Sequence, residues 1–175
     1  MSVTPSRAPE AEPPAPMSED AAIRPARSAD VSAIVKTLQR AFAEYDGRLE
    51  PQPGALRETA ASLRSRVSPH GAAVAVAGER VVGCVLFEHR GTEIYLGRLA
   101  VLPEWRGHGL ARRLVEHVEH EARAVGAAAV TLNVRVALPE NIILFSRLGY
   151  REVGRLAHKG FSDPTFLVMM KKTAG

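Results

Sequence analysis

The sequence predicts one α/β domain whose central sheet is mixed, mostly antiparallel and flanked by helices. Its 175 residues are about the length of a single domain and are sufficient to bury a large core. Short β-rich runs and segments of helical periodicity follow one another along the chain. Two neighbouring runs carry a hairpin signal, and a third is followed by a helix and another strand. Together these features require a mixed sheet.

Residues 1–20 fall outside this pattern. They are rich in proline and alanine, with glutamate and serine between them. Such a segment cannot bury enough apolar surface to offset the entropy lost on ordering. We therefore expect a disordered tail over residues 1–20 and a folded domain over residues 21–175. Met17 is an alternative start to Met1, and the sequence does not decide between them.

A strand and two helices are expected first. Residues 23–26 form a short strand candidate, and Ser28 or Asp30 can cap the helix that follows. Apolar residues at helical spacing extend that helix to about Glu44. A second helix is predicted over about residues 54–67, again because its apolar residues share one face.

Three strands are expected in the middle of the chain. The β-rich runs 72–77 and 81–89 flank the turn residues 78–80, which predicts a hairpin. Residues 93–102 form the third run, which ends at Pro103.

A long helix is predicted over about residues 109–125, closed by Gly126. Residues 128–134 form the next strand, so the unit 93–134 is expected to be of the parallel, right-handed kind. One side of the helix is apolar. Its other side is expected to be exposed and carries Arg112, Arg113, Glu116, Glu119, His120 and Arg123.

A short helix and two strands complete the domain. Pro139 opens the helix and Gly149 ends it, which is the usual asymmetry of helix termini. Residues 150–157 and 165–171 are the last two strand candidates. The expected order is therefore β-α-α-β-β-β-α-β-α-β-β.

Composition argues against several classes of function. The net charge of +4 suits a polyanionic ligand, but the cations are scattered among acidic residues, so we expect no nucleic-acid binding. No stretch reaches the roughly 20 apolar residues of a membrane helix. The one cysteine, Cys84, excludes an internal disulfide and lies in an apolar run, where packing is expected. His117 and His120 lack further metal ligands. We expect a cytoplasmic protein without a bound metal.

The segment from Leu99 to Ala111 carries the clearest chemical signal. A buried strand runs into a turn with Gly107 and Gly109, and the long helix starts immediately. Amides at a helix start lack intrahelical partners, and the helix dipole adds partial positive charge there. The glycines let an anion approach these amides, so the segment predicts a phosphate site.

Two common phosphate-binding patterns do not fit. A dinucleotide loop needs a third glycine and follows the first strand, whereas this glycine pair comes late in the chain. A P-loop needs Gly-Lys-Ser or Gly-Lys-Thr, which the sequence lacks. A helix dipole contributes at most about 2 kcal/mol, so a tightly bound ligand must have a longer body along the protein.

Arg106-x-x-Gly109-x-Ala111 resembles the pyrophosphate motif of the GNAT superfamily of N-acetyltransferases. The preceding Leu99–Pro103 resembles that family's fourth strand, and Ser146–Tyr150 resembles its later leucine–glycine–aromatic signature. The resemblance covers roughly residues 22–171. It implies an acyl-CoA N-acyltransferase fold that transfers acetyl from acetyl-CoA to a primary amine of a small molecule or peptide. Dimers are common in the family, but no sequence feature decides whether this chain forms a homodimer.

The resemblance also implies which residues contact the cofactor. The main chain of the fourth strand would pair with the pantetheine arm, the loop amides would hold the pyrophosphate, and Asn141 would reach the pantetheine. The expected cofactor-binding residues are Leu99, Ala100, Val101, Arg106, Gly107, His108, Gly109, Leu110, Ala111, Asn141 and Phe145.

The catalytic and acceptor-binding residues are less clearly marked. The family usually has a tyrosine as acid to the thiolate where this chain has Phe145, which has no proton to give. Glu93 and His158 are the candidate bases, against plainer roles as a solvated carboxylate and a surface histidine. The first-to-second-helix loop lines the acceptor pocket in the family, so Glu44, Tyr45 and Asp46 are the candidate acceptor-binding residues, against a merely polar loop. A non-catalytic acyl-CoA-binding or sensing domain is the alternative function.

Overall fold

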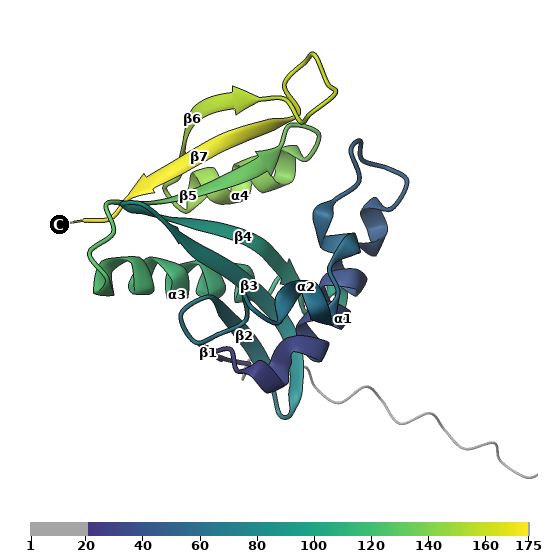
Figure 1. Ribbon diagram of the computed structural model, residues 1–175, viewed down its shortest axis with the longest axis vertical. Helices are drawn as coiled ribbons and strands as arrows, with labels where there is room; N and C mark the ends of the chain where they lie inside the picture. The colour runs from purple at the N-terminus through teal and green to yellow at the C-terminus, as the bar shows by residue number, and fades with distance from the viewer. Residues whose placement is uncertain (1–20, 175) are drawn as a thin grey trace, which may run out of the picture.

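Seven strands form one open sheet in the order β1-β2-β3-β4-β5-β7-β6 (Figure 1). The computed structural model describes residues 21–174, so the tail expected over residues 1–20 lies outside the described residues. The strands are β1 (Ala22–Pro25), β2 (Ala72–Ala77), β3 (Arg80–Arg90), β4 (Glu93–Val101), β5 (Ala129–Arg135), β6 (Arg151–Leu156) and β7 (Phe166–Lys172).

Of these neighbours, β4 and β5 are parallel, and every other adjacent pair is antiparallel. The hairpin of β2 and β3 forms at its expected place. The helix between β4 and β5 makes the parallel connection that the sequence predicted. The predicted mixed, mostly antiparallel sheet is therefore confirmed.

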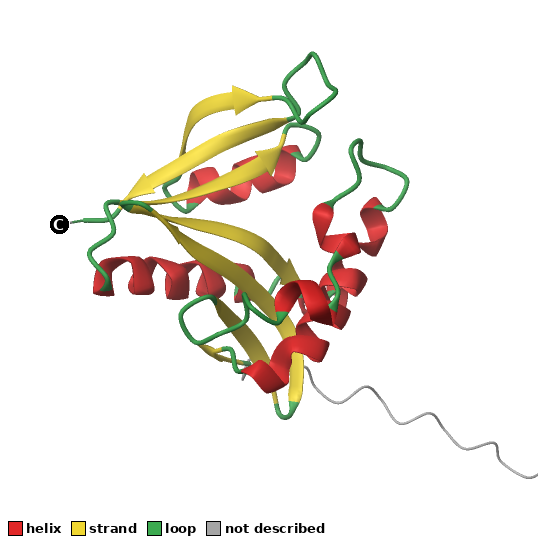
Figure 2. Ribbon diagram, viewed as in Figure 1, coloured by secondary structure: helices red, strands yellow, loops and turns green. Residues whose placement is uncertain are grey.

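Helices cover both faces of the sheet (Figure 2). Buried side chains of α3 (Leu110–Ala124) and Phe145 of α4 (Pro139–Arg147) join one hydrophobic cluster, while α1 (Val31–Phe42) and α2 (Ala60–Leu63) pack into the other. The strands contribute alternate residues to the two clusters, since successive side chains of a strand point to opposite faces. The central strands β2 and β3 are thus largely buried on both sides, whereas β6 at the edge is exposed.

The prediction of one helix over residues 54–67 is wrong, because only part of this segment is helical. The chain instead makes a 3-10 turn, η3 (Gly54–Arg57), followed by the four-residue α2. Between them Glu58 and Thr59 are extended, and the hydroxyl of Thr59 caps α2 by accepting from the amide of Ser62 at 3.1 Å. Glu58 is turned into the protein, where it meets two arginines. These polar contacts stabilise the observed conformation more than a continuous helix over these residues would.

The exposure predicted for Glu119 is also wrong. Only 8% of this residue is exposed, and its carboxylate receives the Lys171 ammonium at 2.9 Å and the Tyr150 hydroxyl at 3.1 Å. Burial and this carboxylate raise the pKa of the Tyr150 phenol. The ion pair joins α3 to β7 close to the segment in which β4 and β5 are paired.

Replacing Glu119 with alanine leaves the Lys171 ammonium and the Tyr150 hydroxyl without their acceptor. We expect this substitution to lower the free energy of unfolding by about 2 kcal/mol, measured by urea denaturation. Glu116→Ala on the same helix breaks the exposed Arg112–Glu116 pair and should cost less than about 0.5 kcal/mol. Equal losses in the two variants would contradict a structural role for the buried pair.

Candidate active site

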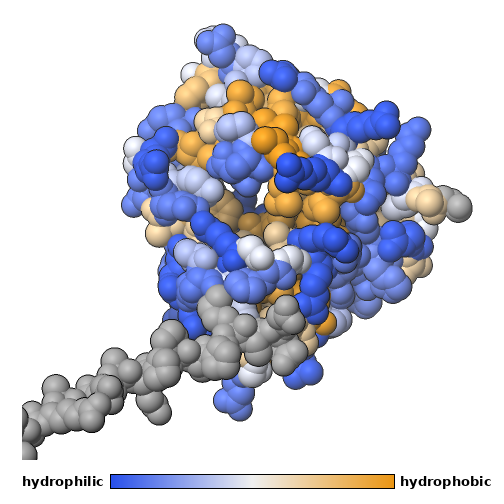
Figure 3. All heavy atoms as spheres, turned by 180° about the vertical axis from the view of Figure 1, so that it is seen from behind, coloured by the Kyte–Doolittle hydropathy of each residue, from blue (hydrophilic) through white to orange (hydrophobic). Residues whose placement is uncertain are grey.

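Strands β4 and β5 are paired along only part of their length. Their parallel register runs from Glu93 opposite Ala129 to Leu96 opposite Leu132, and beyond it the strands separate (Figure 1). From Gly97 to Val101, β4 stays paired with β3 on its other side. In the space-filling view from behind, the surface is hollowed near its middle, with hydrophobic residues beside the hollow (Figure 3). The gap therefore exposes the backbone edge of β4.

A β-bulge lies where β4 leaves β5. The register between β3 and β4 shifts between Cys84 and Leu86, and Arg98 opposite this shift has a left-handed φ of 51°. Within residues 21–174 it is the one residue other than glycine with a positive φ. The Cys84 thiol contacts the Arg98 carbonyl at 3.9 Å. Burial raises the pKa of Cys84 to about 12, so this cysteine packs rather than reacts, as expected.

The larger cavity, about 840 Å³, opens on one side of the gap. The end of β4, the following loop, the start of α3 and parts of α1 and α4 line it. It brings together nine of the residues that the sequence predicted for cofactor binding: Leu99, Ala100, Val101, Arg106, Gly107, Gly109, Leu110, Ala111 and Asn141.

The start of α3 is built to receive an anion. Gly107 and Gly109 have φ values of 80° and 74°, a region in which a side chain is strained. Gly109 is the N-cap and offers no side-chain acceptor, so the first three amides of the helix lack a helical partner. The first turn contains no acidic residue, and Arg112 lies there against the helix dipole. An anion bound at this end would accept hydrogen bonds from the free amides and would balance the charge of Arg112.

Arg106 anchors the glycine loop to the end of α1. Its guanidinium donates to the Val101 carbonyl at 3.3 Å, the Ala41 carbonyl at 3.0 Å and the Glu44 carboxylate at 2.8 Å. An arginine suits this role because its planar group offers several donors at once. His108 is exposed, and its Nδ1 contacts two carbonyls of its own loop, so it does not line the cavity.

A second cavity of about 270 Å³ meets the first at the gap. Arg98, Arg135 and His158 lie in its wall, together with Tyr95 and Asn133. Residues from α1, the loop after it, β4 and α4 are common to both cavities: Phe42, Leu49, Leu99, Leu138, Asn141 and Leu144. Two ligands can therefore approach each other through the gap from opposite sides.

His158 is the titratable base of the smaller cavity. Its amide donates to the Thr165 hydroxyl at 2.9 Å, and its Nδ1 contacts the same hydroxyl. The ring packs edge-to-face on Phe166, with centroids 4.8 Å apart. Burial, followed by the positive charge of Arg135, holds the pKa of His158 below its usual value of 6.5. The imidazole is therefore neutral at pH 7 and can accept a proton.

Neither Phe145 nor Tyr150 offers a proton at the gap. Phe145 packs in the core edge-to-face with Tyr150, at 5.7 Å between centroids, and lines the smaller cavity. Tyr150 cannot replace the missing tyrosine hydroxyl, because its own hydroxyl donates to Glu119 and its pKa is raised. None of the six residues shared by the two cavities titrates.

Four of the other predicted site residues lie outside the smaller cavity. Glu93 stands at the first residue of β4, opposite Arg90, about 20 Å along the strand from Leu99. Glu44 and Tyr45 line the larger cavity rather than the smaller one, and Asp46 lines neither. The structure thus places His158, but not Glu93, in the wall of the smaller cavity.

Sequence reasoning missed the two arginines of the smaller cavity. Arg98 interrupts an otherwise apolar strand, and Arg135 follows the last apolar residue of β5. A cation inside a buried strand is the signal that could have identified Arg98. Arg135 gave no such signal, because it was expected just outside its strand.

The described residues contain neither a metal-binding cluster nor a membrane-spanning helix. Between residues 21 and 174, no cluster of three or more His, Cys, Asp or Glu side chains could hold a metal ion. In the same part of the chain, no helix is both long enough and apolar enough to span a bilayer.

Comparison with known proteins gives the family. The acetyltransferase (GNAT) family model matches residues 33–150. The IAA acetyltransferase of Azospirillum brasilense is 36% identical over 93 residues, which are 52% of this chain and 60% of that protein. The chain therefore spans less than two thirds of this curated relative.

Solved structures share the fold at low sequence identity. The PaiA N-acetyltransferase of Thermoplasma acidophilum, in complex with coenzyme A, has a TM-score of 0.72 and 16% identity, covering 86% of this chain and 98% of that chain. The ribosomal-protein-S18-alanine N-acetyltransferase of Escherichia coli has a TM-score of 0.70 and 21% identity, covering 88% and 94%. With a family match over two thirds of its residues and this fold, the chain belongs to the acetyltransferase (GNAT) family.

Proposed function

We propose that this protein is an acetyl-CoA-dependent N-acetyltransferase that acetylates a primary amine by direct attack in a ternary complex. The observation that carries the proposal is the meeting of two cavities in the gap between β4 and β5. The start of α3, which is suited to an anion, lies in the larger of the two. This arrangement supports binding of the thioester and the amine from opposite sides.

Acetyl-CoA would lie in the larger cavity. The amides at the start of α3 would hold its pyrophosphate, since unpaired helix amides and the dipole both favour an anion. The unpaired edge of β4 at Leu99 and Val101 would bond the pantetheine arm as an added strand does. Asn141, which lines both cavities, would bond the same arm close to the thioester.

The reaction needs alignment and one base. The neutral amine nitrogen attacks the thioester carbonyl, a C–N bond forms, the nitrogen loses a proton to solvent, the C–S bond breaks and the thiolate leaves. His158, held neutral in the smaller cavity, would take the proton from the ammonium form of the amine. Because Phe145 has no proton to give, the thiolate would be protonated by solvent. Alignment by the two cavities would then supply most of the acceleration.

The alternative is a domain that binds acyl-CoA without turnover, which the apolar Phe145 at the acid position favours. Thiol release from acetyl-CoA, followed with a panel of amines, separates the two. Release well above the hydrolysis background with at least one amine supports the enzyme. CoA binding without release for any amine would instead support the sensor.

Replacing Gly109 with valine should abolish CoA binding. A β-branched residue at a φ of 74° is strained, and its side chain would cover the amides that hold the pyrophosphate. Isothermal titration calorimetry with CoA measures the loss. Gly91→Val is the matched control, because Gly91 has a φ of 61°, has equally open surroundings and lies in the β3–β4 turn. Unchanged affinity in the Gly109 variant would overturn the placement of the pyrophosphate.

Replacing His158 with glutamine should change the pH dependence of kcat/KM. The depressed pKa of His158 keeps the base form populated at pH 7, so the midpoint of the acidic limb of the wild-type profile should lie below pH 6.5. Without the base, only amine already deprotonated in solution reacts. The variant should therefore lose about 100-fold near pH 7 and recover as the pH approaches the pKa of the amine. A parallel pH profile in the two proteins would exclude His158 as the base.

A further inference from the structure

The charged side chains that line the smaller cavity are all positive. Two arginines, Arg98 and Arg135, are in its wall, and no aspartate or glutamate is among its lining residues. His158 adds no negative charge. A small, partly enclosed space with two cations disfavours a cationic ligand and favours an anionic one, because charges interact more strongly away from bulk water.

Arg135 is a cation without an acidic partner. It is half-buried at the end of β5, and its Nη2 donates to the Pro51 carbonyl at 2.7 Å. No carboxylate within residues 21–174 lies within 4.0 Å of its guanidinium. Burial lowers its pKa, and no neighbouring acid offsets that effect. A half-buried guanidinium of this kind gains most when an anion binds beside it.

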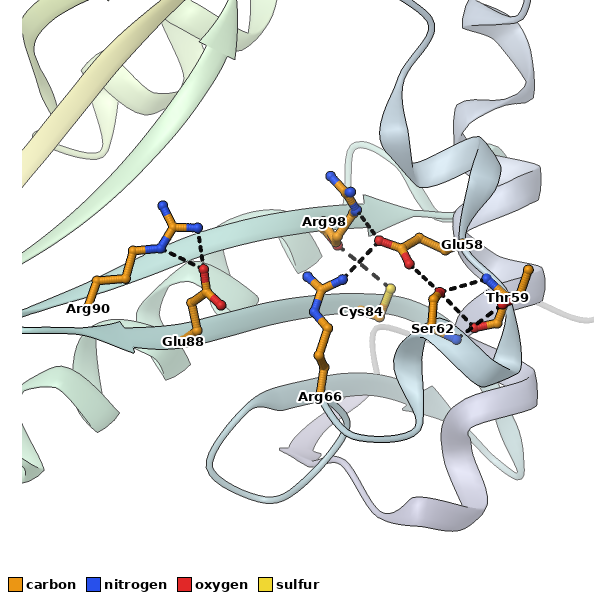
Figure 4. A network of polar contacts seen from close by, with 8 residues as sticks. All are labelled: Glu58, Thr59, Ser62, Arg66, Cys84, Glu88, Arg90 and Arg98. Atoms are coloured by element: carbon orange, nitrogen blue, oxygen red, sulfur yellow. Dashed lines mark hydrogen bonds and ion pairs between the residues drawn. The ribbon is translucent and has the colours of Figure 1, made fainter.

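Arg98 shares its acidic partner with a second arginine. Its Nε donates to Glu58 at 2.8 Å, and Arg66 donates to the same oxygen at 3.0 Å (Figure 4). Ser62 donates to the other oxygen of Glu58 at 2.6 Å. One carboxylate therefore balances two cations, and this cluster keeps a net positive charge beside the cavity.

Gly54 makes room for the Arg98 guanidinium. A Cβ at position 54 would lie 2.6 Å from Arg98 Nη2, too close for any real contact. Glu58 is the partner of Nε, so the terminal nitrogens of Arg98 extend past it over Gly54, which also lines the cavity. The loop after α1 thus fixes both arginines, Arg98 through Gly54 and Glu58, and Arg135 through Pro51.

The rest of the cavity limits the size and polarity of its ligand. A volume of about 270 Å³ is at the lower end for ligand pockets, so it suits a molecule of a few non-hydrogen atoms. Much of the remaining wall is apolar and comprises Phe42, Leu49, Ala55, Leu138, Leu144 and Phe166. The wall can accept a small apolar group next to the two cations.

We propose that the acceptor is a small primary amine that carries a carboxylate, and that Arg135, together with Arg98, binds this carboxylate. The inference rests on the proposed acetyl transfer and adds the chemical class of the acceptor. The amine would lie beside His158, and the carboxylate toward Arg98 of β4 and Arg135 at the end of β5. Diamines would place a second cation against the arginines, and lysine side chains of proteins would bring no carboxylate to them, so both would be poor acceptors.

The test compares free amino acids with their neutral carboxamides. Thiol release with L-alanine and L-leucine is measured against L-alaninamide and L-leucinamide, with putrescine and the tripeptide Leu-Gly-Gly as further arms. We expect kcat/KM for the acids to exceed that for the amides by about 10- to 100-fold, the usual value of a charge-assisted hydrogen bond. Equal or better reaction of the amides, putrescine or the tripeptide would overturn the proposal.

The variant Arg135→Gln separates carboxylate binding from a structural role. If Arg135 binds the carboxylate, the ratio of kcat/KM for the acids to kcat/KM for the amides falls by about 10- to 100-fold in the variant, which so loses the preference. Arg135→Lys should keep part of the preference for acids over amides. If Arg135 only holds Pro51, acids and amides lose equally, which would overturn its role. Arg155→Gln, an exposed arginine paired with Glu152 on β6, is the matched control and should keep the wild-type ratio.

Failure of acetyl transfer can be told apart from failure of this inference. Where no amine releases thiol, the catalytic proposal fails, and binding remains as the readout. N-acetyl-L-leucine should then stabilise the protein–CoA complex in a thermal-shift assay, while N-acetyl-L-leucinamide should not. Stabilisation by both or by neither would overturn carboxylate recognition.

Discussion

The site depends on the point at which hydrogen bonding between two neighbouring strands of the sheet stops. β4 and β5 are paired from Glu93 to Leu96 and separate beyond that point. A sheet normally satisfies its backbone groups strand by strand, so an interior edge left open is available to a ligand. The bulge at Arg98 coincides with the separation, and bulges re-aim side chains and end pairing. Both cavities exist because this pairing stops where it does.

Charge is distributed around this gap in two different ways. On the side of α3, backbone amides and the helix dipole provide partial positive charge, with Arg106 engaged in holding the loop. On the other side, the full charges of Arg98 and Arg135 face the smaller cavity. Backbone groups suit a ligand whose position must be fixed by the main chain, whereas guanidinium groups suit a compact planar anion. The two sides of the gap therefore present positive charge of different kinds.

The sequence was sufficient to predict what depends on local pattern. Helical and strand periodicity located nearly every element, and the glycines at 107 and 109 predicted the turn before α3 because their φ requirement is local. What failed depended on distant contacts. Glu58 leaves the helical register to meet Arg66 and Arg98, and Glu119 is buried by Lys171 from the end of the chain. Arg135 could not be placed in a cavity before β4 and β5 were known to separate.

The ion pair between Glu119 and Lys171 lies at the paired end of β4 and β5, since Lys171 is opposite Val130 and Val130 is opposite Ile94. It joins α3, which packs against β3 and β4, to β7, which pairs with β5. A small rotation of β5 relative to β4 about this point is multiplied by strand length into a larger displacement at Val101. Residues outside both cavities thus help to determine the width of the gap.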